Sequence, residues 1–156
     1  YKGVRSGILG DMACLSFYPS KNLGTYGDAG ATVTSNPTFS AKMKALRIHG
    51  SETKYYHKYL GWNARLDALH AAILRIKLTY LDRWTAGRQQ AAIRYDHLIQ
   101  SKKLDGLLTR PTASPEMRHV WNQYVIRVGG NRRDALVAHL RENQIGCEIY
   151  YPLCLH

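Results

Sequence analysis

At the centre of this sequence lies the segment Ser16-Phe-Tyr-Pro-Ser-Lys21-Asn-Leu-Gly-Thr-Tyr-Gly-Asp-Ala-Gly-Ala31. An apolar run over residues 12–17 leads into it and predicts a short strand, which the proline at position 19 ends. Residues 31–35 predict a second strand. Because neither run alternates cleanly, we expect both strands to be buried on both faces. The three glycines at positions 24, 27 and 30 allow the backbone to adopt φ > 0 and to come close to a bound ligand.

Lys21 is the one lysine of this segment, and it stands just past the end of a predicted strand, among small residues. Desolvation in such a place favours the neutral, nucleophilic amine. A neutral lysine amine can form a Schiff base with a carbonyl compound or with pyridoxal phosphate (PLP). The alternative interpretation is a solvated lysine in a surface loop, and composition alone does not separate the two.

Four blocks of sequence, in this order, carry a resemblance to a known family. They are the Lys21 segment, Leu46-Arg-Ile-His-Gly50, Gly61-Trp-Asn-Ala-Arg-Leu-Asp67 running into Ala71-Ala-Ile-Leu74, and Ile149-Tyr-Tyr-Pro-Leu-Cys-Leu-His156. Together they resemble the DegT/StrS-type nucleotide-sugar aminotransferases, which are PLP enzymes of fold type I. The blocks span nearly the whole chain.

The resemblance implies an α/β fold in which part of the fold type I large domain precedes a long linking helix and a small C-terminal α/β domain. We therefore expect three regions: residues 1–62 from the large domain, 63–104 as linking helices and 105–156 as the small domain. The family is longer and places further cofactor anchors upstream. The sequence is accordingly read as a C-terminal portion that cannot complete a PLP site alone.

Three residues are the expected cofactor contacts. By resemblance, Lys21 holds PLP covalently and then carries protons between the substrate and the cofactor, and Ser16 hydrogen-bonds the cofactor phosphate. Asn63 would reach the phosphate of a neighbouring subunit, which implies a homodimer with a shared active site. Without the resemblance, Ser16 is a polar residue that ends a strand, and Asn63 is a helix cap.

Four further residues are expected at the substrate. His49 lies in a segment rich in His, Lys and Tyr, typical of a binding loop, and Arg65 can pair with a phosphate or carboxylate. Tyr151 and His156 match the segment that lines the family's sugar pocket. For His49 and Arg65 a solvated surface role is the equal alternative. Tyr150 stands where the family usually has histidine, which puts the substrate assignment in question.

The expected function is transfer of an amino group, with glutamate as donor, to a keto carbon of a nucleoside-diphosphate sugar. Some family members carry histidine in place of the lysine and perform dehydration, so Lys21 favours the aminotransferase branch. The alternatives are a PLP-dependent sugar dehydratase and a non-catalytic basic domain that binds ligand or nucleic acid. We expect no metal site and no membrane segment.

Composition limits the possible classes of protein. The 156 residues carry 22 Lys and Arg against 11 Asp and Glu, a net charge of +11. The basic residues are spread along the chain, so a solvated surface is favoured over nucleic-acid binding. Three cysteines lack metal-ligand spacing, and their odd number suits reduced thiols in the cytoplasm. No apolar run approaches the ~18 residues of a membrane helix.

The remaining patterns predict the outline of the chain. Asn36-Pro37 predicts a helix start, and a long surface loop is expected over residues 47–59. Helical periodicity predicts a long helix from Asn63 to Trp84, with a kink at Gly87 and a second helix ending near position 100. A connecting loop over 107–118, a strand over 122–128, a helix over 132–143 and a strand over 147–151 complete the prediction.

Overall fold

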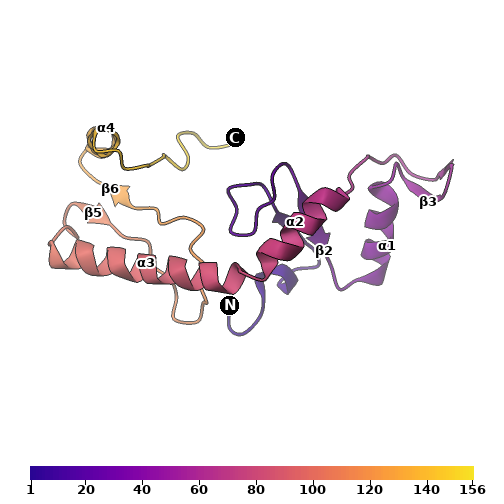
Figure 1. The fold of residues 1–156 in the computed structure, drawn as a ribbon, viewed down its shortest axis with the longest axis horizontal. Coiled ribbons are helices and arrows are strands. Elements are labelled where there is room, and N and C mark those ends of the chain that lie inside the picture. Colours follow the sequence, from indigo (N-terminus) through magenta and orange to yellow (C-terminus); the bar gives the residue numbers. More distant parts are fainter. The chain divides into compact units, whose positions relative to one another are not determined.

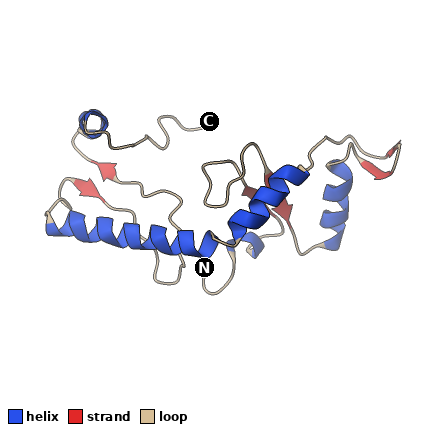
Figure 2. Ribbon diagram, viewed as in Figure 1, coloured by secondary structure: helices blue, strands red, loops and turns tan.

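The chain divides into two compact units. Unit 1 comprises Tyr1–Ala86 with Pro115–Arg118, and unit 2 comprises Gly87–Ser114 with His119–His156. The structure is a computed structural model that describes all residues, 1–156. The chain contains helices and antiparallel pairs of short strands, which confirms a mixed α/β class (Figures 1 and 2). The division into residues 1–62, 63–104 and 105–156 stays a prediction.

Unit 1 begins with a short 3₁₀ helix, η1 (Ser6–Ile8), followed by two strands, β1 (Ala13–Ser16) and β2 (Gly30–Val33). The two strands pair antiparallel, so that Ser16 faces Gly30 across the ladder. Both strands were predicted, but the expectation that they are buried on both faces is wrong. Three of the four residues of β1 are exposed, because the sheet has only these two strands.

Helix α1 (Pro37–Leu46) begins where the sequence predicts. The Asn36 side chain accepts hydrogen bonds from the backbone N–H groups of Thr38 and Phe39, at 2.9 and 3.3 Å. Pro37 occupies the first turn, where a missing N–H costs nothing. The cap and the proline together fix the helix start, which confirms this part of the prediction.

The predicted surface loop over residues 47–59 contains a small hairpin of β3 (Ser51–Thr53) and β4 (Tyr56–His57). Its turn includes Tyr55 at φ 71°. Lys58 forms an ion pair with Glu52 at 3.1 Å across the hairpin. The strands are too short, and their sequence too polar, for the alternation of a strand to be visible in the sequence.

The predicted long helix is two helices, α2 (Ala68–Leu78) and α3 (Leu81–Ser101). Asp67, rather than Asn63, is the N-cap residue of α2. Helix α2 ends at Thr79, whose hydroxyl donates to the Ile76 carbonyl at 2.7 Å. Helix α3 continues without interruption through Gly87, so the break lies at residues 79–80 and the predicted kink at Gly87 is wrong (Figure 1).

Unit 2 contains two short strands and a helix in addition to its part of α3. The strands β5 (Leu108–Thr109) and β6 (Arg127–Val128) pair antiparallel, and α4 (Arg133–Glu142) follows. The helix predicted over 132–143 is confirmed. The strand predicted over 122–128 is reduced to its last two residues, and the strand predicted over 147–151 does not form.

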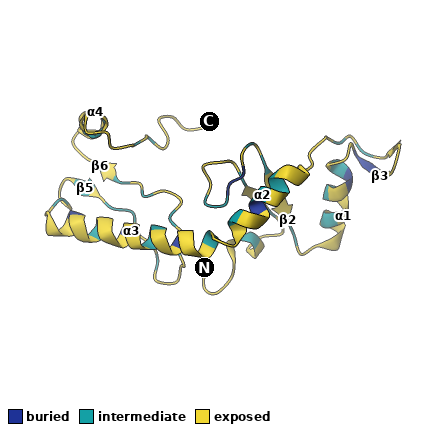
Figure 3. Cartoon of the chain, viewed as in Figure 1, coloured by how far each residue is buried: buried dark blue, intermediate teal, exposed yellow.

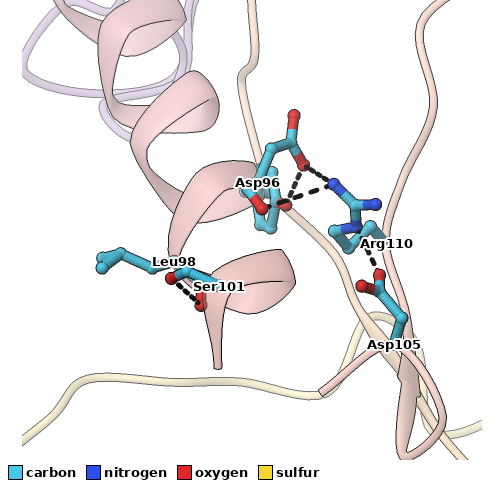
Figure 4. A network of polar contacts seen from close by, with 6 residues as sticks. Asp96, Leu98, Ser101, Asp105 and Arg110 are labelled. Carbon is cyan, nitrogen blue, oxygen red and sulfur yellow. Dashed lines mark hydrogen bonds and ion pairs between the residues drawn. The ribbon is translucent and has the colours of Figure 1, made fainter. Parts of the chain in front are cut away.

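A polar network ties α3 to the segments that follow it in unit 2. The Tyr124 hydroxyl donates to Asp96 Oδ1 at 2.6 Å. Arg110 lies between two carboxylates, with its Nη1 3.5 Å from Asp96 Oδ1 and its Nε 2.9 Å from Asp105 Oδ1 (Figure 4). Burial, followed by the hydrogen bond to Asp96, raises the pKa of Tyr124 well above its ordinary value. This network is therefore a structural element of unit 2.

Few side chains are fully buried (Figure 3). The buried apolar residues are Ala45, Leu74, Ala92 and Ile99, and many large apolar side chains are exposed, including Leu60 at 92% and Tyr55 at 80%. Backbone and polar contacts therefore contribute much of the local order in this chain. None of the helices combines the length and apolar composition that crossing a bilayer requires.

Candidate functional site

The loop that carries Lys21 is closed by backbone hydrogen bonds. Directly after β1, the Phe17 N–H donates to the Ala29 carbonyl at 2.8 Å, which extends the contact between the two strands. The Thr25 N–H donates back to the Phe17 carbonyl at 2.8 Å, and the Lys21 N–H donates to the Tyr18 carbonyl at 2.9 Å. Lys21 thus stands on a loop whose two ends are held together.

Gly24 makes this loop possible through close approach of the backbone. A Cβ atom at this position would lie 2.5 Å from the Tyr18 carbonyl oxygen and 2.7 Å from that of Pro19. No side chain fits at these distances. The freedom to adopt φ > 0 is not used at Gly24, Gly27 or Gly30, none of which has a positive φ. Glycine is instead required at position 24 because a side chain there would clash with neighbouring backbone.

Lys21 itself is exposed, as is Ser16 at the end of β1. The desolvation that the sequence analysis expects around the amine is therefore not provided by the residues of this chain. The Ser16 Oγ accepts only a long hydrogen bond, 3.4 Å, from the Tyr18 N–H. Both groups remain available to bind a ligand.

The Lys21 loop rests against α2. A Cβ on Gly27 would lie 3.1 Å from the His70 ring, and the Lys77 ammonium lies 5.6 Å from the centre of the Tyr26 ring. The sequence analysis did not single out His70 or Lys77. No signal in the sequence could have found them, because their position depends on how α2 packs against the loop. Residues from both ends of α2 therefore contact the loop.

A second group of predicted residues lies on two backbone segments, residues 46–50 and 61–65, that meet side by side. We call this contact the crossing. Ile48 and Asn63 form an antiparallel bridge. It is flanked by hydrogen bonds from the His49 N–H to the Trp62 carbonyl, at 2.8 Å, and from the Ala64 N–H to the Arg47 carbonyl, at 2.9 Å. The bridge holds residues 62–64 in extended pairing with residues 47–49, and helix α2 begins only at Ala68.

Gly61 allows these two segments to cross. A Cβ on Gly61 would lie 2.6 Å from the Leu46 carbonyl oxygen and 2.7 Å from the His49 carbonyl carbon, and would also clash with the Gly50 amide nitrogen. The crossing places His49 beside Asn63. Two of the four blocks that carry the family resemblance therefore meet in space.

Arg65 contacts Asn63 directly. Its Nε donates a hydrogen bond to the Asn63 Oδ1 at 3.0 Å. On the other strand of the crossing, the His57 Nδ1 lies 3.0 Å from the His49 carbonyl oxygen, and the two imidazole rings meet edge to face. We call the three predicted residues His49, Asn63 and Arg65 the crossing cluster. The hydrogen bonds that build it involve neither Lys21 nor Ser16.

The crossing cluster lies in the most basic part of unit 1. Residues 41–65 contain six basic side chains and one acidic side chain, Glu52, a local balance of +5. The six are Lys42, Lys44, Arg47, Lys54, Lys58 and Arg65. The even spread of basic charge expected from the sequence is therefore only approximate. An anionic group is the ligand that this surface favours.

Tyr151 and His156 belong to unit 2, whereas the other predicted site residues belong to unit 1. Both are exposed and lie outside any helix or strand. The Tyr151 ring contacts the Tyr150 ring edge to face, at 5.5 Å between centres. No group of three or more His, Cys, Asp or Glu side chains is placed to hold a metal ion.

Comparison with known proteins gives one consistent match. The family model described as the DegT/DnrJ/EryC1/StrS aminotransferase family matches residues 1–156. A "Pleiotropic regulatory protein" of Geobacillus stearothermophilus is 44% identical over the whole chain, which covers 41% of that protein. The dTDP-3-amino-3,4,6-trideoxy-alpha-D-glucose transaminase of Streptomyces venezuelae is 39% identical, again over the whole chain, which covers 40% of it.

Solved structures agree with these relatives. The crystal structure of S. venezuelae DesV in complex with a ketimine intermediate matches with a TM-score of 0.89 and 38% identity, over 100% of this chain and 41% of that one. The structure of NtdA from Bacillus subtilis with bound cofactor PMP matches with a TM-score of 0.83 and 30% identity, over 92% and 34%. The chain thus spans about 40% of the length of the curated relatives that it matches.

Proposed function

The chain belongs to the DegT/DnrJ/EryC1/StrS aminotransferase family, and from this premise we propose that it supplies the lysine-bearing part of a PLP-dependent nucleotide-sugar aminotransferase. The reaction would move an amino group from an amino-acid donor, glutamate, to a keto carbon of a nucleoside-diphosphate sugar. Because the chain spans about 40% of its relatives, the activity is proposed for the full-length protein that contains it.

One observation carries this proposal: an exposed lysine amine stands on a loop held closed by backbone hydrogen bonds. The loop positions Lys21 through the Phe17–Thr25 and Tyr18–Lys21 hydrogen bonds and the close approach at Gly24. Positioning matters because a nucleophile held in place reacts far faster than a free one. Because the Lys21 amine is exposed and makes no contact that stabilises the fold, it is available to react with a ligand.

The donor groups of unit 1 fit PLP. The cofactor has an aldehyde, which needs an amine, and a phosphate, which needs hydrogen-bond donors and positive charge. Lys21 offers the amine, the Ser16 hydroxyl offers a donor in the same loop, and the Asn63 amide, bonded to Arg65, offers further donors in the crossing cluster. When bound, PLP would supply an electron sink that stabilises negative charge at the substrate carbon.

Each of the predicted site residues then has a defined role. The Lys21 Nζ would attach the cofactor and, once displaced by the amino donor, would accept a proton from the donor's α-carbon and deliver it onward. Ser16 would orient the phosphate. We propose that His49, with Tyr151 and His156 of unit 2, contacts the nucleotide sugar. Arg65, which the sequence also predicts at the substrate, binds Asn63 instead.

We propose further that the enzyme is a homodimer in which Asn63 serves the cofactor phosphate of a second copy. This would make the basic crossing cluster part of a shared active site. A cytoplasmic location is also proposed, because the three cysteines are free thiols. Such thiols persist where the environment is reducing.

The test is chemical trapping in the full-length protein. Incubation with PLP, reduction with borohydride and peptide mass mapping should place a pyridoxyl group on Lys21. A Lys21→Arg variant should lose the adduct, whereas a Lys44→Arg variant should keep it. A wild-type protein that reacts at surface lysines in general, with no preference for Lys21, would contradict the proposal. Product analysis with a keto sugar and glutamate would then distinguish amino transfer from dehydration.

A further inference from the structure

We infer that Arg65 is a positioning residue that fixes the orientation of the Asn63 carboxamide, so that the amide presents both of its N–H donors to an anionic phosphate. The inference rests on the proposed function only for the identity of the anion. It assigns to Arg65 a role through Asn63, which differs from the direct contact with the nucleotide sugar expected from the sequence.

The chemistry of the guanidinium group settles which way the amide points. Every N–H of an arginine is a donor, and a carboxamide has one accepting oxygen and one donating NH₂ group. Because the Arg65 Nε lies 3.0 Å from one end of the Asn63 amide, that end must be the oxygen. The NH₂ end is therefore directed away from Arg65. An asparagine amide without such a partner could flip and offer its oxygen instead.

The backbone of Asn63 is fixed as well. The bridge to Ile48 and the two flanking hydrogen bonds hold residues 62–64 against residues 47–49. Asn63 is thus held at its backbone by the crossing and at its amide oxygen by Arg65. The hydrogen bond restricts a side chain that is otherwise exposed, so less entropy is lost when an anion binds to its NH₂ group than for a free amide.

The surroundings favour an anion at this place. The outward edge of the amide has only donors, and the adjacent guanidinium group adds a full positive charge. The segment 41–65 carries a balance of +5. A phosphate is a good match because its oxygens accept several hydrogen bonds at once.

Binding measurements on the full-length protein can test this inference. The affinity for PLP would be measured by absorbance titration for the wild type, Asn63→Ala, Arg65→Met and the double variant. If Arg65 acts through Asn63, the double variant should bind no more weakly than the weaker single variant, with a coupling of about 5-fold or more. Pyridoxal, which lacks the phosphate, should show no difference among the four proteins. Lys54→Met removes a neighbouring charge and should change the affinity by less than about 2-fold, because it is an exposed charge.

Losses that multiply in the double variant would overturn the inference, because Arg65 would then contact the ligand independently. An unchanged affinity in Arg65→Met would overturn it too. If the wild type binds neither PLP nor pyridoxal, the proposed function fails, and the same four proteins are titrated with inorganic phosphate by calorimetry. Coupled losses of phosphate binding would then support the positioning role by itself. Absent or additive losses would overturn it.

Discussion

Polar side chains serve opposite purposes in the two units. In unit 2, Tyr124, Asp96, Arg110 and Asp105 bind one another, so the network uses their hydrogen-bonding capacity for structure. In unit 1, backbone groups hold the Lys21 loop and the crossing cluster, and Lys21, Ser16 and the NH₂ group of Asn63 remain available. When backbone hydrogen bonds fix the geometry of a site, its side chains remain available to a ligand. Such a site requires glycine where two backbone segments come close together.

Replacing Lys21 should have the largest effect on activity and almost none on stability. Lys21→Ala in the full-length protein should lower kcat for amino transfer by at least ~10²-fold, because the amine both binds the cofactor and moves protons. The free energy of unfolding should stay within about 0.5 kcal/mol of wild type, since the side chain is exposed. Steady-state kinetics and urea denaturation would measure the two effects. An active Lys21→Ala protein would show that the available amine of unit 1 is not needed for the reaction, and the proposed contrast between the two units would then fail.

Gly61→Ala should cause the largest loss of stability. The added Cβ would lie 2.6 Å from the Leu46 carbonyl oxygen, which is backbone and cannot move aside without opening the crossing. The expected cost is about 2–4 kcal/mol in the free energy of unfolding, measured by denaturant titration. Gly106→Ala is the matched control, because nothing lies within 4 Å of a Cβ there. Equal stability of the two variants would show that the crossing is not held by the glycine.

Tyr124→Phe tests the network of unit 2. It removes the hydrogen bond to Asp96 and should cost about 1 kcal/mol at neutral pH. Tyr95→Phe is the control, since the Tyr95 ring stacks on Tyr124 at 5.0 Å and keeps that contact as phenylalanine. Both variants should still form the PLP adduct at Lys21. A larger loss from Tyr95→Phe, which removes only a hydroxyl, would show that the Tyr124–Asp96 hydrogen bond is not the main polar contribution to stability in this region.

The same variant gives a pH dependence with a defined sign. Burial and the Asp96 hydrogen bond raise the pKa of Tyr124 in the folded state above its ordinary value of about 10. Above that pH the unfolded chain loses the tyrosine proton first, so the unfolded state is favoured. The contribution of Tyr124 is therefore complete below about pH 10 and is lost as the pH rises further. The difference in stability between wild type and Tyr124→Phe should shrink over that range, as followed by urea titrations at each pH.

The features predicted correctly from the sequence depend on neighbours in the chain. Asn36 and Pro37 specify a helix start within one turn, and the apolar runs around the Lys21 segment specify two strands. The helix of residues 133–142 follows from its own amphipathic pattern. In each case the signal is local, because the cap lies within one turn and each strand or helix carries its own apolar pattern within one window of sequence.

The features that sequence reasoning missed depend on distant contacts. The helix predicted from Asn63 begins at Ala68, because residues 62–64 are held in extended pairing with residues 47–49. For the candidate site, the motifs identified Lys21, Asn63 and Arg65. They did not indicate that Arg65 binds Asn63, since no pattern within one segment encodes the orientation of an amide.

Gly87→Ala should have the smallest effect, and one opposite in sign to that of Gly61→Ala. Glycine usually weakens a helix interior, and the sequence analysis accordingly predicted a kink here. The structure instead continues α3 from Leu81 to Ser101, and nothing lies within 4 Å of a Cβ at Gly87. Alanine should therefore stabilise the protein by about 0.5–1 kcal/mol, because it restricts the unfolded chain and favours the helix. Thermal unfolding of the full-length protein would detect this as a higher midpoint. A lower midpoint would mean that the glycine is needed for close packing or a bend at this position, and that backbone constraints of the kind found at Gly61 extend into α3.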